Sequence, residues 1–527
     1  MNHKGKKIRF TFLLSLPLLA FFLGYLFNHS SELEPTGFIQ YDNVSYIAYA
    51  KQYLDADFLH LQYSNPFNDS NFAPSYIQPQ TFFIAFLLKI GIPPGWILIP
   101  FSFIFSLICF WLIISLYDFL FPQSKWRTLN IWLFAWGGGI LVLAGLFAQF
   151  YLKEKTGFVN GLFVLDPESG WWGLNLGRSL FFTCEAYYHA LFLGCIYSLL
   201  KRKWLQGFIL MLLLSLSHPF SGIELIGIVC AWCFVEFLHN KKEIPVLFFA
   251  GALAALCFHI YYYLFYLEQF PDHKSVSEQY TLTWRLGIYR MIPAYCIVGA
   301  LTIASIYKFS FKKFFEIRGN RIFACWFLVA FLLANHEIFM KARQPIHFTR
   351  GYIWTSLFLL GLPALNLLNS WLKPKFGKAG IAVFAALFFL DNFSWISNQA
   401  LSKKTQTDAT YINKEQKEVL KILNSESSNK SLIISSDNTI AYLSSVYTKA
   451  YPWYSHQYTT PFSERKKLAQ EAFLNTGIVD SAWINREINF VLKKTDTVAL
   501  NAIGRIPMEK LIQTENYFIL KCRLSGN

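Results

Sequence analysis

Long apolar stretches alternate with short polar segments from the N-terminus to about residue 397. Several of these stretches reach about 18 residues or more, which is enough for a helix to cross a bilayer. They lie near residues 8–27, 95–121, 128–150, 178–200, 203–217, 220–238, 244–267, 286–307, 322–339, 351–371 and 379–396. The pattern predicts an α-helical polytopic membrane protein with about eleven transmembrane helices.

The first two of these spans are separated by a large first loop, residues 28–93. Within it, Tyr76 to Ile90 is apolar, but at about 15 residues it is too short to span a bilayer easily. Gly91-Ile92-Pro93-Pro94 follows directly. We interpret this stretch as a juxtamembrane helix at the outer interface, and we predict a second short helix from Asp42 to about Leu54.

The pattern changes after residue 397, where residues 398–430 are polar and rich in Ser, Lys, Thr and Asn. Residues 431–435, 488–492 and 517–521 have the composition of strands, and Glu415 to Leu423 and Ser463 to Leu474 that of helices. We therefore predict two domains. Residues 1–397 form the transmembrane domain, and residues 398–527 form a small soluble α/β domain.

Composition and charge support a membrane protein and set its orientation. The chain is 54% hydrophobic and 15% charged, against about 25% charged residues in soluble proteins. The net charge of +15 falls in short clusters between apolar stretches, which indicates membrane topology rather than nucleic-acid binding. We predict an uncleaved signal anchor and a cytoplasmic N-terminus, and these basic clusters then lie on the cytoplasmic side of the membrane. The C-terminal domain then lies outside a bacterial inner or plasma membrane, on the same side as Asp42.

The first candidate for chemistry is the acid at the start of the predicted 42–54 helix. At helical spacing Asp42 shares a face with Tyr46, Tyr49 and Tyr53, while Val44, Ile47, Ala48 and Leu54 share another. Such a helix would lie on the membrane with its apolar side down. A carboxylate there can accept a proton from a sugar or alcohol hydroxyl. The alternative is that Asp42 is a helix N-cap and that the tyrosines are interfacial anchors.

The second candidate is a basic loop, residues 341–352, between two spans on the predicted outer side. It carries Lys341, Arg343, His347 and Arg350, although positive charge is disfavoured on that side. Arg and Lys suit phosphate oxygens, and phosphate at this depth would belong to a lipid carrier. The alternative is ordinary interfacial snorkelling or headgroup contact.

Polar residues near the predicted spans form a third group, because ionisable groups in a membrane are functional hypotheses by default. Together with Tyr46 and Tyr49, the candidates for a substrate cavity are Asp166, Glu168, Arg178, Glu185, His189, His218 and Glu224. Several plainer interpretations stay open. Glu185 and His189 have the i, i+4 spacing of a structural pair. His218 lies between two predicted spans and can be an ordinary loop residue. The 166–173 segment is also typical of a turn with interfacial Trp.

Two short motifs resemble a known family. Tyr41-Asp42-Asn43, with Tyr46 and Ala50, resembles the first-loop acid and helix of the GT-C superfamily of membrane glycosyltransferases. Ala73-Pro74-Ser75-Tyr76-Ile77-Gln78-Pro79-Gln80 resembles the Pro-containing start of that family's second interfacial helix. Mannosyltransferases and aminoarabinose transferases are of this kind. The resemblance implies a polyprenyl-phosphate sugar donor, Asp42 as the base, and Arg343, His347 and Arg350 as ligands of the carrier phosphate.

The chain also departs from the family, in which two adjacent acids often occur in the first loop. Asn43 follows Asp42 here, so this position does not support a divalent cation, and no cofactor is assigned. The resemblance implies an inverting transfer to a hydroxyl of a glycan, lipid or protein acceptor. Two other classes stay open, a lipid or polysaccharide flippase and a non-catalytic membrane protein of envelope assembly. Neither they nor the enzyme need a nucleic-acid partner.

Overall fold

The computed structural model describes residues 3–58, 60–68, 74–152, 158–166, 175–240, 244–279, 285–429, 431–504 and 508–523. The chain forms two compact units. The first consists of Met1–Gly24, Phe101–Tyr261 and Thr281–Ser402, and the second of Tyr25–Pro100, Tyr262–Tyr280 and Lys403–Asn527. Residues 403–527 thus cluster with residues 25–100, and the domain boundary at 397/398 stays a prediction.

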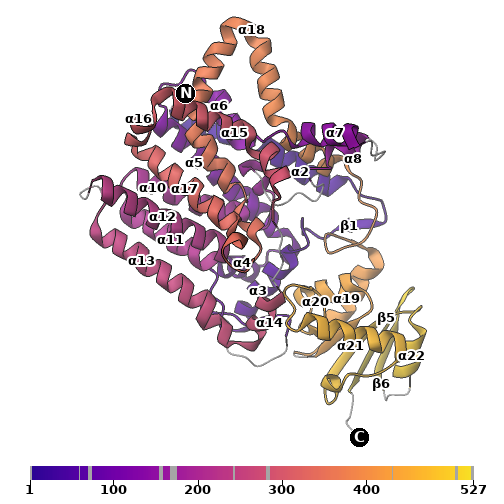
Figure 1. The fold of residues 1–527 in the computed structure, drawn as a ribbon. Helices are drawn as coiled ribbons and strands as arrows, with labels where there is room; N and C mark the ends of the chain where they lie inside the picture. The colour runs from indigo at the N-terminus through magenta and orange to yellow at the C-terminus, as the bar shows by residue number, and fades with distance from the viewer. Residues whose placement is uncertain are drawn as a thin grey trace. The chain divides into compact units, whose positions relative to one another are not determined.

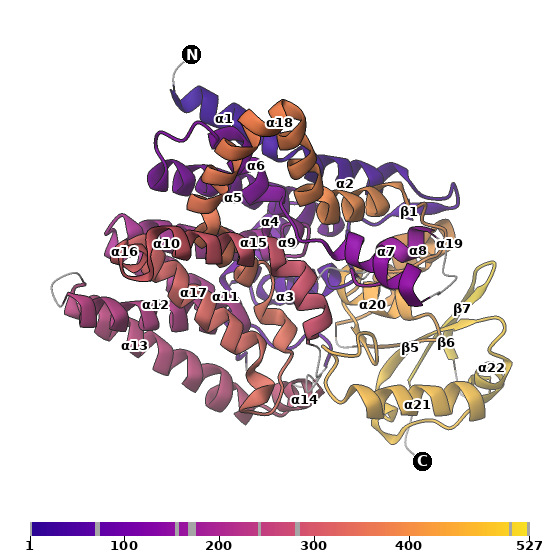
Figure 2. The same cartoon turned by 45° about the horizontal axis from the view of Figure 1, so that its top comes forward.

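The first unit is built from helices. In chain order they are α1 (His3–Leu14), α2 (Leu16–Phe27), α5 (Leu98–Leu120), α6 (Arg127–Trp136), α7 (Leu141–Leu152), α8 (Phe158–Leu162), α9 (Leu176–Ser179), α10 (Glu185–Leu200), α11 (Trp204–Ser217), α12 (Pro219–His239), α13 (Val246–Tyr261), α15 (Ile288–Phe309), α16 (Phe311–Glu316), α17 (Arg318–Ala334), the 3-10 turns η4 (His336–Ile338) and η5 (Pro345–Phe348), and α18 (Tyr352–Leu401). Each of the helices α10, α11 and α12 packs against the next one in the chain, and α11 also contacts α13 (Figures 1 and 2).

Helix α18 contains two of the predicted spans. Figure 1 shows it as two limbs that meet at a sharp bend. At Gly377 the backbone leaves the helical region, with φ 60° and ψ −153°, and a positive φ is a conformation that glycine adopts readily. The limbs on either side of Gly377 contain the predicted spans 351–371 and 379–396.

Among the described residues, five helices are long and apolar enough to cross a membrane, or up to seven if each of two bent pairs is one span. The pairs are α1 with α2, bent by 41°, and α6 with α7, bent by 56°. The exact number of eleven crossings stays a prediction. One predicted span is wrong in detail. The stretch 178–200 is broken between α9 and α10, so Arg178 does not share a helix with Glu185 and His189.

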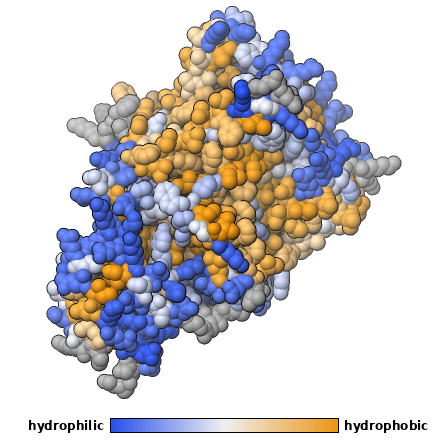
Figure 3. Space-filling view, turned by 180° about the vertical axis from the view of Figure 1, so that it is seen from behind, coloured by the Kyte–Doolittle hydropathy of each residue, from blue (hydrophilic) through white to orange (hydrophobic). Residues whose placement is uncertain are grey.

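The surface of the first unit is apolar over wide areas. Phe150 in α7 is 86% exposed, Leu247 in α13 is 85% exposed, and Tyr307 in α15 is 90% exposed. Figure 3 shows a broad hydrophobic surface on one face of the molecule. In water such a surface would be an aggregation liability, whereas in a bilayer lipid chains cover it. The first unit is therefore the region of a multi-pass membrane protein that lies in lipid.

The second unit combines the first loop with the C-terminal region. Its elements are β1 (Leu33–Pro35), α3 (Asn43–Asp55), α4 (Pro79–Lys89), η1 (Pro94–Trp96), η2 (Tyr262–Tyr266), η3 (Leu267–Gln269), α14 (Pro271–Gln279), β2 (Tyr411–Asn413), α19 (Lys414–Glu426), β3 (Leu432–Ser435), α20 (Asn438–Tyr447), β4 (Tyr451–Pro452), α21 (Ser463–Thr476), η6 (Ser481–Trp483), β5 (Glu487–Lys493), α22 (Thr497–Ile503), β6 (Met508–Gln513) and β7 (Tyr517–Arg523). Strand β1 pairs with β2, antiparallel.

A five-stranded sheet with the order β4-β3-β5-β7-β6 forms the core of the C-terminal region. Strand β3 runs parallel to β4 and β5, whereas β7 runs antiparallel to β5 and β6. Ile488, Phe490 and Leu492 alternate along β5 and pack against Phe473 of α21 and Trp483. The predicted strands and helices of this region are confirmed as β3, β5, β7, α19 and α21.

Helices α3 and α4 agree with the sequence in length but not in surroundings. With 11 residues, α4 is about 16 Å long, too short to span a bilayer, as predicted. The expectation that α3 rests its apolar side on lipid is wrong. Val44 and Ile47 are fully buried within the protein, and Tyr53, predicted on the upper face, is buried too. The helix packs against α4 and α20.

Candidate functional site

Asp42 lies at the residue that precedes α3, as predicted, but its side chain does not cap the helix. The backbone there is helical, with φ −67° and ψ −15°, and the carboxylate accepts no hydrogen bond from the first turn. The side chain is 55% exposed. The N-cap interpretation of Asp42 is therefore wrong for its side chain, which is held by another contact and is open to solvent.

That contact is His456, in the segment between β4 and α21. Its Nε2 lies 3.1 Å from Oδ1 of Asp42, and the ring is only 4% exposed. The ring of Tyr41 stacks on the imidazole at a centroid distance of 5.0 Å, and that of Tyr442 lies 5.3 Å away. A half-exposed carboxylate is thus fixed from one side by a buried imidazole.

Tyrosine side chains border this acid. The hydroxyl of Tyr442, in α20, lies 2.7 Å from the Ser45 hydroxyl, one turn along α3 from Asp42. Burial raises the pKa of the Tyr442 phenol, and the nearby Asp42 carboxylate raises it further. Tyr442 therefore stays a neutral hydroxyl at physiological pH. Tyr46 and Tyr49 are half-buried, with ring centroids 6.2 Å apart.

The basic loop divides into an exposed part and an internal part. The side chains of Lys341 and Arg343 are exposed, whereas the guanidinium of Arg350 forms an ion pair with Glu185 of α10 and contacts His347. The loop is ordered by η5 and by the Arg343 backbone N–H, which donates to Nε2 of His336 at 2.9 Å. The positive charge of Arg350 is thus already neutralised by Glu185, whereas the side chains of Lys341 and Arg343 are exposed.

Three other polar candidates of the first unit, His189, His218 and Glu224, have different surroundings. His189 and Glu185 are 3.9 Å apart, beyond hydrogen-bonding distance, because Glu185 turns to Arg350 instead. Nδ1 of His218 accepts the Ser221 N–H at 3.1 Å and so caps α12. Glu224 is fully buried, and within the described ranges neither of its carboxylate oxygens has a hydrogen-bond partner.

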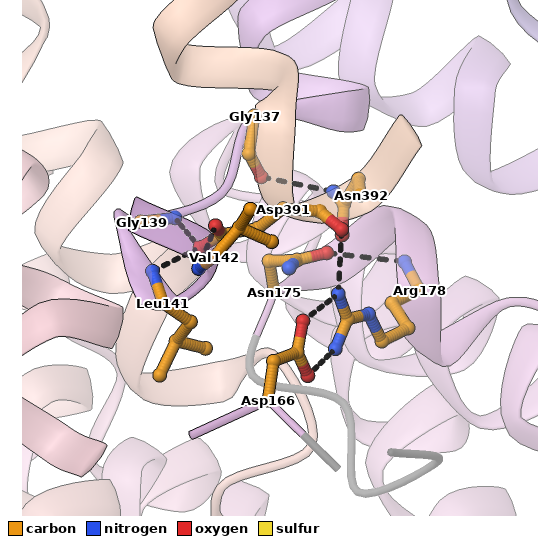
Figure 4. A network of polar contacts seen from close by, with 9 residues as sticks. All are labelled: Gly137, Gly139, Leu141, Val142, Asp166, Asn175, Arg178, Asp391 and Asn392. Atoms are coloured by element: carbon orange, nitrogen blue, oxygen red, sulfur yellow. Dashed lines mark hydrogen bonds and ion pairs between the residues drawn. The ribbon is translucent and has the colours of Figure 1, made fainter. Parts of the chain in front are cut away.

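A second acid, Asp391 in α18, lies in a closed polar network (Figure 4). Its Oδ2 accepts the N–H groups of Gly139 and Leu141 at 3.0 and 2.9 Å, and its Oδ1 accepts that of Val142 at 3.0 Å. These donors lie at the bend between α6 and α7, where a helix start leaves backbone N–H groups without partners. Lipid cannot supply an acceptor, so Asp391 stabilises the bend.

Arg178 and Asp166 complete this network. Their fully buried side chains form a two-pronged ion pair, with N–O distances of 2.5 and 2.7 Å, and Arg178 also donates to the backbone oxygen of Asp391. Asp166 and Arg178 therefore hold each other in the protein interior, and the prediction that they line an open substrate cavity is wrong. Glu168, predicted beside Asp166, lies outside the described residues.

Sequence reasoning missed His456 and Asp391 for different reasons. His456 is 414 positions from Asp42 and lies in a polar segment, so no pattern points to it. Asp391 falls within the predicted span 379–396, and an acid inside a span is itself a signal for a structural or functional partner. In the described part of the chain, no group of three or more His, Cys, Asp or Glu side chains is arranged to hold a metal ion.

The fold is that of a multi-pass membrane protein with a small α/β region and an acid at the start of a short helix. It is similar to the crystal structure of ArnT from Cupriavidus metallidurans bound to undecaprenyl phosphate, with 10% identity, 100% coverage of each chain and a TM-score of 0.49. The apo structure of that protein gives 10% identity, 98% coverage of each chain and a TM-score of 0.44.

At 10% identity and TM-scores of 0.49 and 0.44, this likeness assigns neither a family nor an activity to this chain. No protein-family model matches the sequence. A search of curated proteins finds no match either.

Proposed function

We propose that the protein is an inverting glycosyltransferase that moves a sugar from a polyprenyl-phosphate carrier to an acceptor hydroxyl. Asp42 takes the proton of that hydroxyl, and the resulting oxygen nucleophile attacks the anomeric carbon. The bond between this carbon and the carrier phosphate oxygen breaks, and the electron pair leaves with the lipid phosphate. Cationic side chains stabilise the charge on the departing phosphate.

The state of the Asp42 carboxylate carries this proposal. A general base must be ionised, reach the substrate and keep an oxygen free to accept a proton. Asp42 is half-exposed, does not cap α3 and accepts from His456 through Oδ1. Among the described residues, its second oxygen, Oδ2, has no hydrogen-bond partner, so it can accept the proton of an incoming hydroxyl.

The basic loop supports the phosphate part of the proposal. Lys341 and Arg343 are exposed, and exposed cations can meet a phosphate without first breaking an ion pair. Arg350 already pairs with Glu185, so a phosphate would have to compete with that carboxylate. We therefore assign the first contact with the carrier phosphate to Lys341 and Arg343, and the support of the loop to Arg350 and His347.

The test is the profile of lipid-linked sugars in cells whose copy of this protein carries Asp42→Asn. The asparagine keeps the size of the side chain but cannot act as a base, so a polyprenyl-phosphate sugar should accumulate. The matched control is Asp57→Asn, an exposed position in the same loop where the backbone φ of 47° suits asparagine. A profile unchanged by Asp42→Asn at a normal protein level would refute the base role. It would leave a flippase or an assembly protein as the better class.

A further inference from the structure

We infer that His456 is a positioning residue for the base, fixing the Asp42 carboxylate through a single defined tautomer. The inference rests on the proposed function and adds to it a residue from the C-terminal region. Both side chains belong to the second unit. The role is assigned from the hydrogen bonds at the two ring nitrogens.

The partners of Nδ1 fix the place of the imidazole proton. Nδ1 accepts the backbone N–H of Tyr458 at 3.1 Å and that of Thr459 at 3.2 Å. A nitrogen that accepts hydrogen bonds carries no proton, so in the neutral ring the proton is on the other nitrogen. Nε2–H therefore donates to Oδ1 of Asp42 at 3.1 Å.

The surroundings of the ring make it a rigid donor. The backbone N–H of His456 donates to the Thr460 hydroxyl at 3.1 Å, which closes a tight turn over residues 456–460. Tyr41 and Tyr442 pack against the ring. With Oδ1 held in this way, the carboxylate cannot rotate freely, and Oδ2 keeps one direction for the acceptor hydroxyl. This orientation matters for the rate, because misplacing a reacting group by about 1 Å can lower the rate about 100-fold.

Two substitutions separate this role from a purely structural one. In His456→Asn the amide oxygen takes the place of Nδ1, which keeps the bonds from Tyr458 and Thr459 and removes the donor to Asp42. In His456→Gln the amide nitrogen takes the place of Nε2, which keeps the donor to Asp42 and removes the acceptor for the turn. The positioning role predicts that Gln rescues activity and Asn does not, whereas a structural role predicts the reverse order.

The assay uses the lipid fraction that accumulates in Asp42→Asn cells as the donor. It is supplied to membranes that contain each full-length variant, and initial rates are normalised to the amount of protein. For His456→Asn we expect kcat to fall about 10- to 100-fold, with KM for the lipid changed by less than about threefold because binding does not use this contact. His456→Gln should keep kcat within about threefold of the parent value.

The outcomes separate this inference from the proposed function. If Asp42→Asn causes no accumulation, the proposed function fails and this inference fails with it. If Asp42→Asn blocks turnover while His456→Asn keeps full kcat, the positioning role alone is overturned. Equal losses in the Asn and Gln variants would also overturn it, because they would show that the turn, and not the donor to Asp42, is what matters.

Discussion

Asp42 and Asp391 are both acids beside the start of a short helix, yet their surroundings are opposite. Asp391 is fully buried in the first unit and accepts three backbone N–H groups at the start of α7. Asp42 precedes α3 in the second unit, accepts no bond from that helix and is half-exposed. Its described partner is one imidazole N–H.

The contrast shows how the number of donors decides what a carboxylate can do. An ionised carboxylate offers about four acceptor positions. Where backbone donors fill most of them, the group holds structure and has no place for a substrate proton. Where one donor fixes one oxygen, the other oxygen stays available. Position at a helix start is the same in both cases and does not distinguish them.

The largest expected effect is that of Asp42→Asn on turnover. Loss of a general base lowers the rate about 10²- to 10⁴-fold, and because the side chain is half-exposed the protein should fold as before. The measurement is initial turnover of the accumulated lipid donor per amount of membrane-embedded protein. If the activity of Asp42→Asn fell only because less protein was present, Asp42 would act on stability, as expected for Asp391, and the contrast between the two acids would fail.

Asp391→Asn is expected to act on stability instead. An amide has one acceptor oxygen, so its NH₂ group would face at least one of the backbone donors of Gly139, Leu141 and Val142. Hydrogen bonds to a charged group contribute about 1.5–3 kcal/mol each, and we expect a loss of about 3 kcal/mol. This should appear as a lower thermal midpoint of the purified full chain and less protein in the membrane. Turnover per folded molecule should be nearly normal, and an unchanged midpoint would show that the network is not needed.

The contrast between the two acids also marks what the sequence could reveal. Short apolar runs with the composition of strands located β3, β5 and β7, because burial of a strand depends on residues that the local sequence shows. The position of Asp42 after the first span indicated an exposed acid. The sequence did not reveal that Oδ1 of Asp42 is held by His456, since such a pairing depends on how the second unit folds.

The buried ion pairs were hidden for the same reason. Arg350 was predicted to bind the carrier phosphate, but it forms an ion pair with Glu185 of α10. Asp166 and Arg178 were expected in a cavity wall, but each balances the charge of the other. Charge type is visible in a sequence, whereas the partner that neutralises the charge lies in a different segment of the chain.

A moderate effect is expected in the double variant Lys341→Ala, Arg343→Ala. Removing exposed cations weakens the capture of an anionic lipid phosphate, so KM should rise about tenfold while kcat changes little. The increase should be smaller at high salt, because salt screens exposed charges. Binding of undecaprenyl phosphate to the purified full chain gives an independent measurement.

The comparison variant is Arg350→Ala, in which the buried carboxylate of Glu185 loses its partner and stability should fall. If Arg350→Ala raised KM as much as the double variant does and left stability unchanged, the division of the loop into an exposed and an internal part would be contradicted.

The smallest expected effect concerns Lys466, a buried cation in the same unit as Asp42. Its ammonium donates to the Phe67 carbonyl and the Asn68 side chain. Burial lowers the pKa of Lys466 from 10.5 to about 8, while Asp272 acts in the opposite direction. Between about pH 8 and 10.5 the unfolded chain therefore binds more protons at this residue than the folded chain, and stability from this group rises with pH.

Replacing Lys466 by Met removes that dependence. The thermal midpoint of the parent protein, relative to that of Lys466→Met, should therefore increase from pH 8 to pH 10, because the cost of burying a charged ammonium disappears as it loses its proton. Thermal unfolding of both full-length proteins over this range is the measurement. The matched control is Lys467→Met, a change at the neighbouring exposed lysine. A shift of the same size and sign in that control would show that burial of Lys466 is not the cause.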